Sequence, residues 1–169
     1  MNGQLAPGPA ALAFRAVGLE DVAEVLRLVR RAVEAGCGAH YRPRERDAVV
    51  EVYTRSLFVE ALGPFESIAA EQGGRLVGFA QLDPAASRLR ALFVDGEHQG
   101  TGKGRALLAE IEARARRRGC ARLHGAMSLN AVPFYAAAGF VAADGPPRLM
   151  SVENGVTVPI VRMEKQLKG

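Results

Sequence analysis

A glycine-rich segment between two apolar runs has the composition of an anion-binding loop. Gly100, Gly102 and Gly104 separate residues 92–94, typical of a strand, from residues 106–108, typical of a helix. Glycine carries no side chain that could block a ligand, and it adopts positive φ without steric cost, so successive N–H groups can point into one concavity. The free N–H groups and the dipole of the following helix add positive potential. The segment therefore predicts a site for phosphate or pyrophosphate.

The spacing of the glycines excludes two common phosphate-binding motifs. A Walker A loop would need glycine at 97 and serine or threonine at 104, where the chain has Glu97 and Gly104. A dinucleotide fingerprint would place its last glycine at Arg105 or Leu107. What remains is the pattern Q-x-x-G-x-G, and the predicted ligand-binding residues of this loop are Gln99, Gly100, Thr101, Gly102, Lys103, Gly104 and Arg105.

This pattern closely resembles the acyl-CoA pyrophosphate loop of the GNAT superfamily of N-acetyltransferases. A second segment has the family's spacing N-x-x-x-x-F-Y-x-x-x-G-F, filled here by Asn130, Phe134, Tyr135, Gly139 and Phe140. Asn130 is also expected to cap a short helix that ends at Gly139. Taken alone, Phe134 and Tyr135 would be two core aromatics on a short helix. The resemblance implies instead that Asn130 contacts the pantetheine arm and that Tyr135 protonates the departing CoA thiolate, which a phenol can do.

The resemblance also implies a direct mechanism. In the family the fourth and fifth strands splay apart, and the acyl-pantetheine arm enters the gap beside backbone groups of Leu92, Phe93 and Val94. One of their N–H groups would polarise the thioester carbonyl. The acceptor amine attacks directly, so neither cysteine is needed as a nucleophile. The general base stays open between Glu71, His124, His40, Tyr41 and a chain of water molecules.

The acceptor pocket is the least defined part of the expected site. In the family it is built from the first two helices and from the segment near the sixth and seventh strands, here residues 37–46 and 146–154. Arg42, Arg44 and Arg46 suggest an acceptor with a carboxylate or phosphate, but a solvated row of arginines explains them equally well. The pattern therefore predicts an amine on a small molecule or a peptide and no particular compound.

Length and composition indicate one globular domain. Of the 169 residues, 49% are hydrophobic, and no stretch approaches the length of apolar sequence that spans a membrane. Residues 1–11 are expected to form a mobile tail without a secretory signal, and residues 12–169 a single domain in the cytoplasm. Two cysteines suit a reducing compartment. Cys37, His40, Cys120 and His124 would together make a Cys₂His₂ zinc site, but neither spacing is distinctive, so no metal is expected.

The net charge of +4 does not by itself indicate a nucleic-acid partner. The densest basic run, Arg114, Arg116, Arg117, Arg118 and Arg122, has no interleaved aromatic residues and suits the end of a helix. A solvated helix end is therefore the preferred interpretation, and no specific nucleic acid is expected as a partner.

The elements that must hold these residues follow from hydrophobic periodicity. Helical spacing predicts helices over 19–34, 44–62, 102–118 and 130–138. Alternation predicts strands over 12–17, 67–71, 75–82, 88–94, 121–127, 140–143 and 156–166, with a hairpin at 73–74. The periods alone support a mixed α/β fold. The resemblance implies a mostly antiparallel, twisted, seven-stranded sheet flanked by about four helices.

These observations predict an acetyl-CoA-dependent N-acetyltransferase with Tyr135 as its catalytic residue. The alternatives are a non-catalytic domain that binds acyl-CoA as a sensor or partner module, and a nucleic-acid-binding protein that uses the arginine cluster. A homodimer is possible, and no membrane partner is expected.

Overall fold

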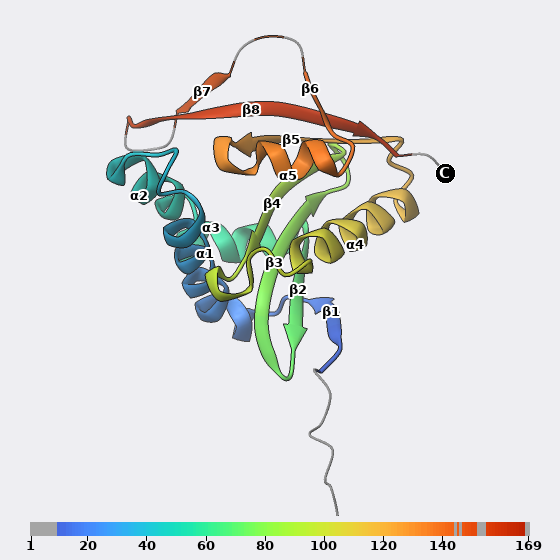
Figure 1. Cartoon of the computed structure of the whole chain (residues 1–169). Coiled ribbons are helices and arrows are strands. Elements are labelled where there is room, and N and C mark those ends of the chain that lie inside the picture. The colour runs from blue at the N-terminus through green and yellow to red at the C-terminus, as the bar shows by residue number, and fades with distance from the viewer. Residues whose placement is uncertain (1–9, 144, 146, 152–154, 168–169) are drawn as a thin grey trace, which may run out of the picture.

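The computed structural model describes residues 10–143, 145, 147–151 and 155–167. Most of the expected tail, residues 1–9, lies outside the described residues. The described chain builds one sheet of eight strands (Figure 1). The strands are β1 (Leu12–Ala16), β2 (Glu66–Gln72), β3 (Arg75–Asp83), β4 (Arg88–Val94), β5 (Arg122–Ser128), β6 (Val141–Ala142), β7 (Arg148–Ser151) and β8 (Thr157–Gln166).

The strand order is β1-β2-β3-β4-β5-β8-β6, and β7 pairs with β8 as well. Every neighbouring pair is antiparallel except β4 and β5, which run parallel. The expectation of a mixed, mostly antiparallel sheet is therefore confirmed. The parallel pair lies in the middle of the sheet, between two antiparallel halves.

Among the described residues, five α-helices and three short 3₁₀ turns cover the two faces of the sheet. The helices are α1 (Val22–Gly36), α2 (Pro43–Glu51), α3 (Arg55–Leu62), α4 (Lys103–Arg117) and α5 (Val132–Ala137), and the turns are η1 (Leu19–Asp21), η2 (Gly96–His98) and η3 (Leu129–Ala131). Figure 1 shows α1, α2 and α3 on one side of the sheet and α4 and α5 on the other. We call these the α1 side and the α4 side.

Each side has its own hydrophobic core. On the α1 side, Val25, Leu28 and Val29 of α1 pack with Phe58 and Phe79. The core of the α4 side is formed by a second set of residues that includes Leu107, Leu108, Ile111, Leu123, Tyr135 and Phe140. Since both α1 and α4 contact β3 and β4, the central strands are covered on both faces.

The structure differs from the expectation in the number of elements. The eighth strand is β7, whose four residues are all exposed, so no alternation of apolar and polar residues marks it in the sequence. The expected helix 44–62 is two helices, because Thr54 accepts a hydrogen bond from the Leu57 N–H and starts a new helix at Arg55. Five α-helices therefore replace the expected four.

Candidate active site

The strands β4 and β5 meet at one end only and then diverge. Their single paired position is Arg88 with His124, while β4 stays paired with β3 and β5 with β8 along their lengths. The last close approach is at Gly125, where a Cβ atom would lie 2.8 Å from the carbonyl oxygen of Leu89. Beyond it the two strands form no further pairs, so the sheet has a gap at its centre.

The register of β4 decides which backbone groups face this gap. The N–H of Asp95 donates to the carbonyl of Val77, which lies directly opposite. Hydrogen-bonded and non-hydrogen-bonded pairs alternate in an antiparallel ladder, so Phe93 also points its N–H toward β3. The N–H groups of Leu92 and Val94 therefore point toward the gap. Of the three expected residues, these two offer donors there, and Phe93 offers its ring.

The glycine loop at the end of β4 has the conformation of an anion cradle. Gly100 and Gly102 have φ values of 73° and 83°, and a Cβ atom on either would meet no atom within 4 Å. Helix α4 begins directly after Gly102 and has no acidic residue in its first turn. Within the described part of the chain, the N–H groups of residues 100–105 have no hydrogen-bond acceptor. Together with Lys103 and Arg105, they present positive potential to a ligand.

Gln99 has a positioning role that its place in the motif did not reveal. Its Nε2 donates to the carbonyl oxygens of Val94 and Ala32, each at 3.2 Å. One side chain thus joins the end of β4 to α1 and fixes the start of the loop. The Nε2 of Gln99 is therefore bonded to the protein itself, and a direct contact between Gln99 and the ligand stays a prediction.

Two further residues hold the same loop, and the sequence did not single them out. Arg31 of α1 donates to Asp95 through Nε at 2.9 Å and through Nη2 at 2.6 Å. Asp95 is buried, and its other oxygen accepts the Glu97 N–H at the start of η2. The guanidinium of Arg31 and the N–H of Glu97 lower the pKa of Asp95, although burial opposes them. An Asp before Gly96 is a recognisable turn signal, but nothing in the sequence indicates its partner.

Tyr135 is buried on the α4 side, in the core cluster against which Leu92 of β4 packs. Its ring contacts Phe134 and Phe140 edge to face, with centroid distances of 5.0 and 5.4 Å. Burial raises the pKa of Tyr135 well above the usual value for a phenol, so the hydroxyl stays protonated at neutral pH. Its hydroxyl has no hydrogen-bond partner among the described residues. A protonated, unpaired phenol at this place suits a proton donor.

Asn130 lies at the gap, but it does not cap α5. The 3₁₀ turn η3 precedes the helix, so Ala131 takes the cap position and makes no side-chain hydrogen bond. The Oδ1 of Asn130 instead accepts from the Cys37 thiol at 3.4 Å. A Cβ atom on Gly36 would lie 3.3 Å from the Asn130 Nδ2, so this amide packs against the end of α1. The expected capping role is therefore wrong, and a role in ligand binding stays a prediction.

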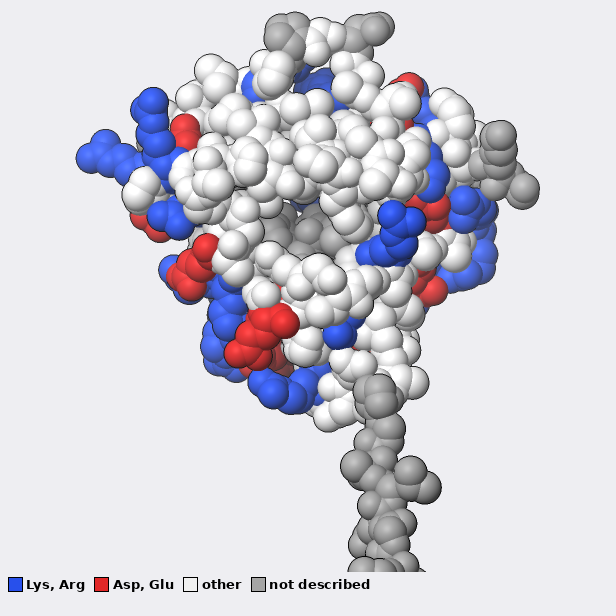
Figure 2. All heavy atoms as spheres, in the orientation of Figure 1, with Lys and Arg blue, Asp and Glu red and all other residues white. Residues whose placement is uncertain are grey.

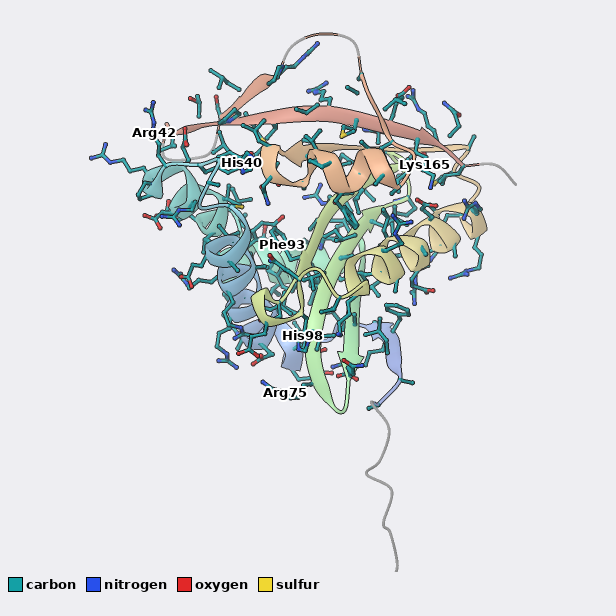
Figure 3. The ribbon with its side chains drawn as sticks, viewed as in Figure 1. His40, Arg42, Arg75, Phe93, His98 and Lys165 are labelled. Atoms are coloured by element: carbon teal, nitrogen blue, oxygen red, sulfur yellow. The ribbon has the colours of Figure 1, made fainter. Side chains whose placement is uncertain are left out.

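The α1 side of the gap carries aromatic residues that the sequence did not point to. Tyr53, between α2 and α3, packs its ring edge to face on Phe93 at 5.3 Å. Figure 3 shows Phe93 near the middle of the molecule, on β4. Burial raises the pKa of Tyr53 to about 12, and the Arg90 cation partly opposes this. The Tyr53 hydroxyl also acts electrostatically on Tyr135, although the two rings belong to cores on opposite sides of the sheet.

Three of the candidate bases have other partners. Glu71 forms an ion pair with Arg15 at 2.7 Å on β2, two strands from β4. His124 lies at the closed end of the β4–β5 pair, with its Nε2 2.9 Å from the Ala86 carbonyl. The Tyr41 hydroxyl donates to the Pro159 carbonyl and accepts from the Leu129 N–H, both at 2.7 Å. These positions make all three structural, and Tyr41 in particular fixes the loop after α1.

Several side chains of the segment between α1 and α2 are exposed and do not pack in the core. His40 is exposed in this loop (Figure 3). Arg42 and Arg44 are exposed as well, whereas the Nε of Arg46 is buried without a hydrogen-bond partner among the described residues. In the second expected acceptor segment, residues 146 and 152–154 lie outside the described residues.

The basic run at the end of α4 forms ion pairs with four glutamates. Arg114 pairs with Glu66 and Glu110, Arg118 with Glu66, and Arg117 with Glu110. Arg116 pairs with Glu112 and Arg122 with Glu164. All five arginines therefore have acidic partners, which weakens the alternative that this run binds nucleic acid.

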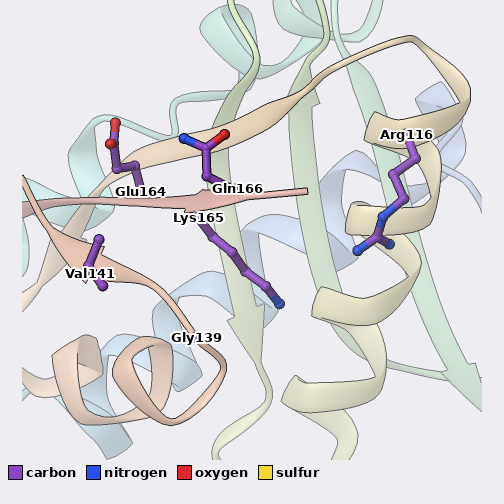
Figure 4. A pocket seen from close by; sticks show the side chains of 6 residues that line it. All are labelled: Arg116, Gly139, Val141, Glu164, Lys165 and Gln166. Atoms are coloured by element: carbon purple, nitrogen blue, oxygen red, sulfur yellow. The ribbon is translucent and has the colours of Figure 1, made fainter. Parts of the chain in front are cut away.

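A depression of about 470 Å³ lies away from the gap, between the end of β8 and α4. Its lining residues are Arg116, Gly139, Val141, Glu164, Lys165 and Gln166 (Figure 4). Lys165 pairs with the buried Glu112 at 2.7 Å. Neither the glycine loop nor the backbone groups of β4 reach this depression, so it is separate from the candidate active site.

No cluster of metal ligands was found in the described ranges. Cys37 contacts Asn130, while Cys120 donates to the Pro84 carbonyl at 3.5 Å, so the two cysteines lie in different surroundings. No three His, Cys, Asp or Glu side chains of the described residues come together as metal ligands. Among the same residues, no helix is both long enough and apolar enough to cross a membrane.

The gap and the glycine loop fit an acyl-CoA. Figure 2 shows a hollow at the centre of the molecular face, surrounded mainly by uncharged residues, which suits the uncharged pantetheine arm. The loop 100–105 lies at the carboxyl end of β4 and offers free N–H groups for a pyrophosphate. The inward N–H groups of Leu92 and Val94 would meet the thioester. The described residues therefore offer groups suited to the pyrophosphate, the pantetheine arm and the thioester.

Comparisons with known proteins agree with this geometry. The model of the GNAT acetyltransferase domain matches residues 40–167. One similar structure is that of a GCN5-related N-acetyltransferase from Rhodopseudomonas palustris, which is also named aminotransferase, class-II. It is 26% identical to this chain and has a TM-score of 0.85. The match covers 98% of this chain and all of that one. None of the curated proteins compared with this chain matches it.

Two similar structures contain a form of the cofactor. PaiA N-acetyltransferase from Thermoplasma acidophilum, solved in complex with coenzyme A, is 18% identical with a TM-score of 0.74 over 92% of this chain and 99% of that chain. YncA from Salmonella typhimurium, solved with its cofactor acetyl-CoA, is 20% identical with a TM-score of 0.63 over 95% and 96% of the two chains. At these identities the likeness shows the fold.

Proposed function

Because this chain belongs to the GNAT family of acetyltransferases, we propose that it transfers the acetyl group of acetyl-CoA to an amine of a small molecule or peptide by direct attack in a ternary complex. The observation that carries the proposal is the divergence of β4 and β5 beside the glycine loop. It exposes the N–H groups of Leu92 and Val94 in the same gap that Tyr135 borders. The two similar structures that hold coenzyme A or acetyl-CoA support the choice of co-substrate.

The chain's residues would bind the pyrophosphate and the pantetheine arm of the co-substrate. The N–H groups of residues 100–105 and the charges of Lys103 and Arg105 hold the pyrophosphate. Asn130 of η3, which packs against the end of α1, contacts the pantetheine arm. Acetyl-CoA supplies the acetyl group already activated as a thioester. Gln99 and the Arg31–Asp95 pair keep the loop in register with β4.

The chemistry follows from the groups that face the gap. The amine nitrogen forms a bond to the acetyl carbon and the carbon–sulfur bond breaks. The N–H groups of Leu92 and Val94 stabilise the negative charge that develops on the carbonyl oxygen. Tyr135 gives its proton to the departing thiolate and regains one from solvent. The attacking amine loses its proton to His40, which is exposed, or to solvent water, because Glu71, His124 and Tyr41 have other partners.

The experiment that tests this proposal mixes the purified protein with acetyl-CoA and a panel of primary amines. Release of free thiol and formation of acetylated amine are measured together, and we expect equal amounts of both. Steady-state plots at several fixed amine concentrations should intersect, and mass spectrometry with acetyl-CoA alone should show unmodified protein. An acetyl group on Cys37 or Cys120 that an amine then removes would contradict direct attack.

A non-catalytic acyl-CoA-binding domain is the alternative. It predicts the same binding of acetyl-CoA but no acetylated amine with any member of the panel. The unpaired, protonated Tyr135 argues against it, because a binding domain has no need of a proton donor at the gap.

A further inference from the structure

The guanidinium of Arg90 is held rigidly on the α1 side of the sheet. Its Nε donates to the Gln81 Oε1 at 3.1 Å, and its plane lies over the Phe65 ring at 3.9 Å. Gln81 is buried and is itself fixed by a hydrogen bond of 2.9 Å from its Nε2 to the Ser67 hydroxyl. Such a chain of contacts removes most of the conformational freedom of the arginine before any ligand arrives.

These contacts leave the two Nη groups of Arg90 available. Among the described residues, no carboxylate pairs with Arg90 and no acceptor binds its Nη atoms. Arg88, two residues earlier on the same strand, pairs with Asp83 at 3.8 Å. A fixed guanidinium with both Nη groups free matches the geometry of a carboxylate, which it can bind through two parallel hydrogen bonds.

A β-bulge sets the direction of the Arg90 side chain. The register between β3 and β4 shifts so that Gln81 lies opposite Ala91, while Leu82 lies opposite Leu89. Arg90 is therefore the extra residue of a bulge. Bulges of this kind turn a side chain to a new direction and are frequent beside active sites. Without the shift, Arg90 would not share a face with Ala91, which belongs to the core of the α1 side.

The same side of the gap carries a second group without a partner. The Tyr53 hydroxyl has no hydrogen bond to any described residue, and burial raises the pKa of Tyr53 while the Arg90 cation opposes this rise. Tyr53 also packs on Phe93, the residue between the two β4 donors. The glycine loop and Tyr135 lie on the opposite, α4 side. An acceptor that enters from the α1 side would thus meet Arg90 and Tyr53 before it reaches the thioester.

We propose that the acceptor is a primary amine that also carries a carboxylate, that Arg90 binds this carboxylate through its two Nη groups, and that Tyr53 positions the acceptor beside Phe93. The inference rests on the proposed acetyl transfer and adds the substrate class. Arg90 is a specificity-determining residue, since it contacts the acceptor away from the reacting atoms.

The test uses pairs of amines that differ only in their second functional group. Each amine is supplied with a free carboxylate and as the neutral carboxamide, and kcat/KM for acetylation is measured for both. We expect the intact protein to prefer the carboxylate by about 10- to 100-fold, as a charge-assisted, two-point hydrogen bond would give. Arg90→Gln should bring this ratio close to one, mainly through KM for the carboxylate, and Arg90→Lys should restore part of it.

Three variants serve as controls. Arg88→Gln, on the same strand but already paired with Asp83, should keep the full preference. Tyr53→Phe should lower kcat/KM for both members of a pair and leave their ratio unchanged. Arg46→Gln tests the other arginine near the expected acceptor loop, and it too should keep the preference.

Failure of this inference and failure of the proposed function give different results. If no amine is acetylated, the proposed function is wrong. If kcat/KM is the same for carboxamides and carboxylates, acetyl transfer stands and the assignment of Arg90 is overturned. The same holds if Arg46→Gln removes the preference and Arg90→Gln does not. Calorimetric binding of the acetylated carboxylate product to the intact protein and to Arg90→Gln gives a readout that needs no turnover, and equal affinities would contradict the proposal.

Discussion

The Gln99 side chain donates hydrogen bonds of 3.2 Å to the carbonyl oxygens of both Val94 and Ala32. Val94 ends the strand that borders the gap, and Ala32 belongs to α1. Gln99 therefore connects the donors of β4, the proposed phosphate loop and the first helix through a single amide. Both acceptors are backbone carbonyl oxygens, so the Gln99 amide must point its NH₂ group toward them and its oxygen away from them.

We expect Gln99→Ala to weaken binding of acetyl-CoA by about 10-fold, because the loop loses its link to β4 while its own N–H groups remain. Gln99→Glu should be more damaging, since a carboxylate would face two carbonyl oxygens. Isothermal titration calorimetry measures both. Gln72→Ala is the matched control, because Gln72 also donates to a backbone carbonyl, that of Ala10, far from the gap. An unchanged affinity in Gln99→Ala would show that the loop holds its shape without this link.

The glycine cradle gives a second prediction, with a control built into the chain. Gly102 and Gly74 have φ values of 83° and 74°, and a Cβ atom on either meets nothing within 4 Å. Alanine at either position should cost about 1 to 2 kcal/mol of unfolding free energy through the left-handed backbone alone. Only Gly102→Ala should also weaken acetyl-CoA binding, because Gly74 lies in the β2–β3 hairpin. Equal acetyl-CoA affinities in the two variants would place the phosphate elsewhere.

Tyr135→Phe tests the proton donor. It keeps the ring contacts with Phe134 and Phe140 and removes only the hydroxyl, so we expect kcat to fall about 10²-fold with acetyl-CoA affinity nearly unchanged. Tyr41→Phe is the comparison, because the Tyr41 hydroxyl bonds the Leu129 N–H and the Pro159 carbonyl. That variant should lose stability, since a buried N–H is left unpaired. A wild-type kcat in Tyr135→Phe would assign thiolate protonation to water or another group.

The buried phenols also predict how stability responds to alkaline pH. Burial raises the pKa of Tyr53 to about 12 and raises that of Tyr135 above its usual value near 10. Above pH 10 the unfolded chain loses these protons while the folded chain keeps them. The unfolding free energy should therefore be fully retained below pH 10 and fall as the pH rises toward 12. Urea unfolding between pH 9 and 11.5 measures this, and the slope should be smaller in Tyr135→Phe. An identical slope would mean that Tyr135 titrates normally.

Much of the fold was predictable because its periodicity is strong. The strand expected over 88–94 has the observed bounds of β4, and the expected helix 102–118 differs from α4 by one residue at each end. The exposed strand β7 and the break at Thr54 were missed, since one lacks an apolar face and the other depends on a single capping hydroxyl.

The site was predictable only where one segment supplies it. The glycines, Asn130 and Tyr135 lie in two short motifs, so spacing reveals them. Tyr53 and Arg90 come from segments far apart in the sequence. Tyr53 packs on Phe93 of β4, and the bulge sets the direction of Arg90 on the same strand. A one-residue bulge leaves no mark in hydrophobic alternation, and for that reason the acceptor side stayed undefined.

The most direct test of the central claim is a ¹H–¹⁵N NMR titration of the protein with acetyl-CoA. If the thioester enters the gap between β4 and β5, the largest amide shifts will be those of Leu92 and Val94, together with residues 100–105. Phe93, whose N–H is bonded to β3, should shift less than its two neighbours. Shifts confined to the depression lined by Arg116 and Lys165, with the β4 amides unchanged, would contradict the account.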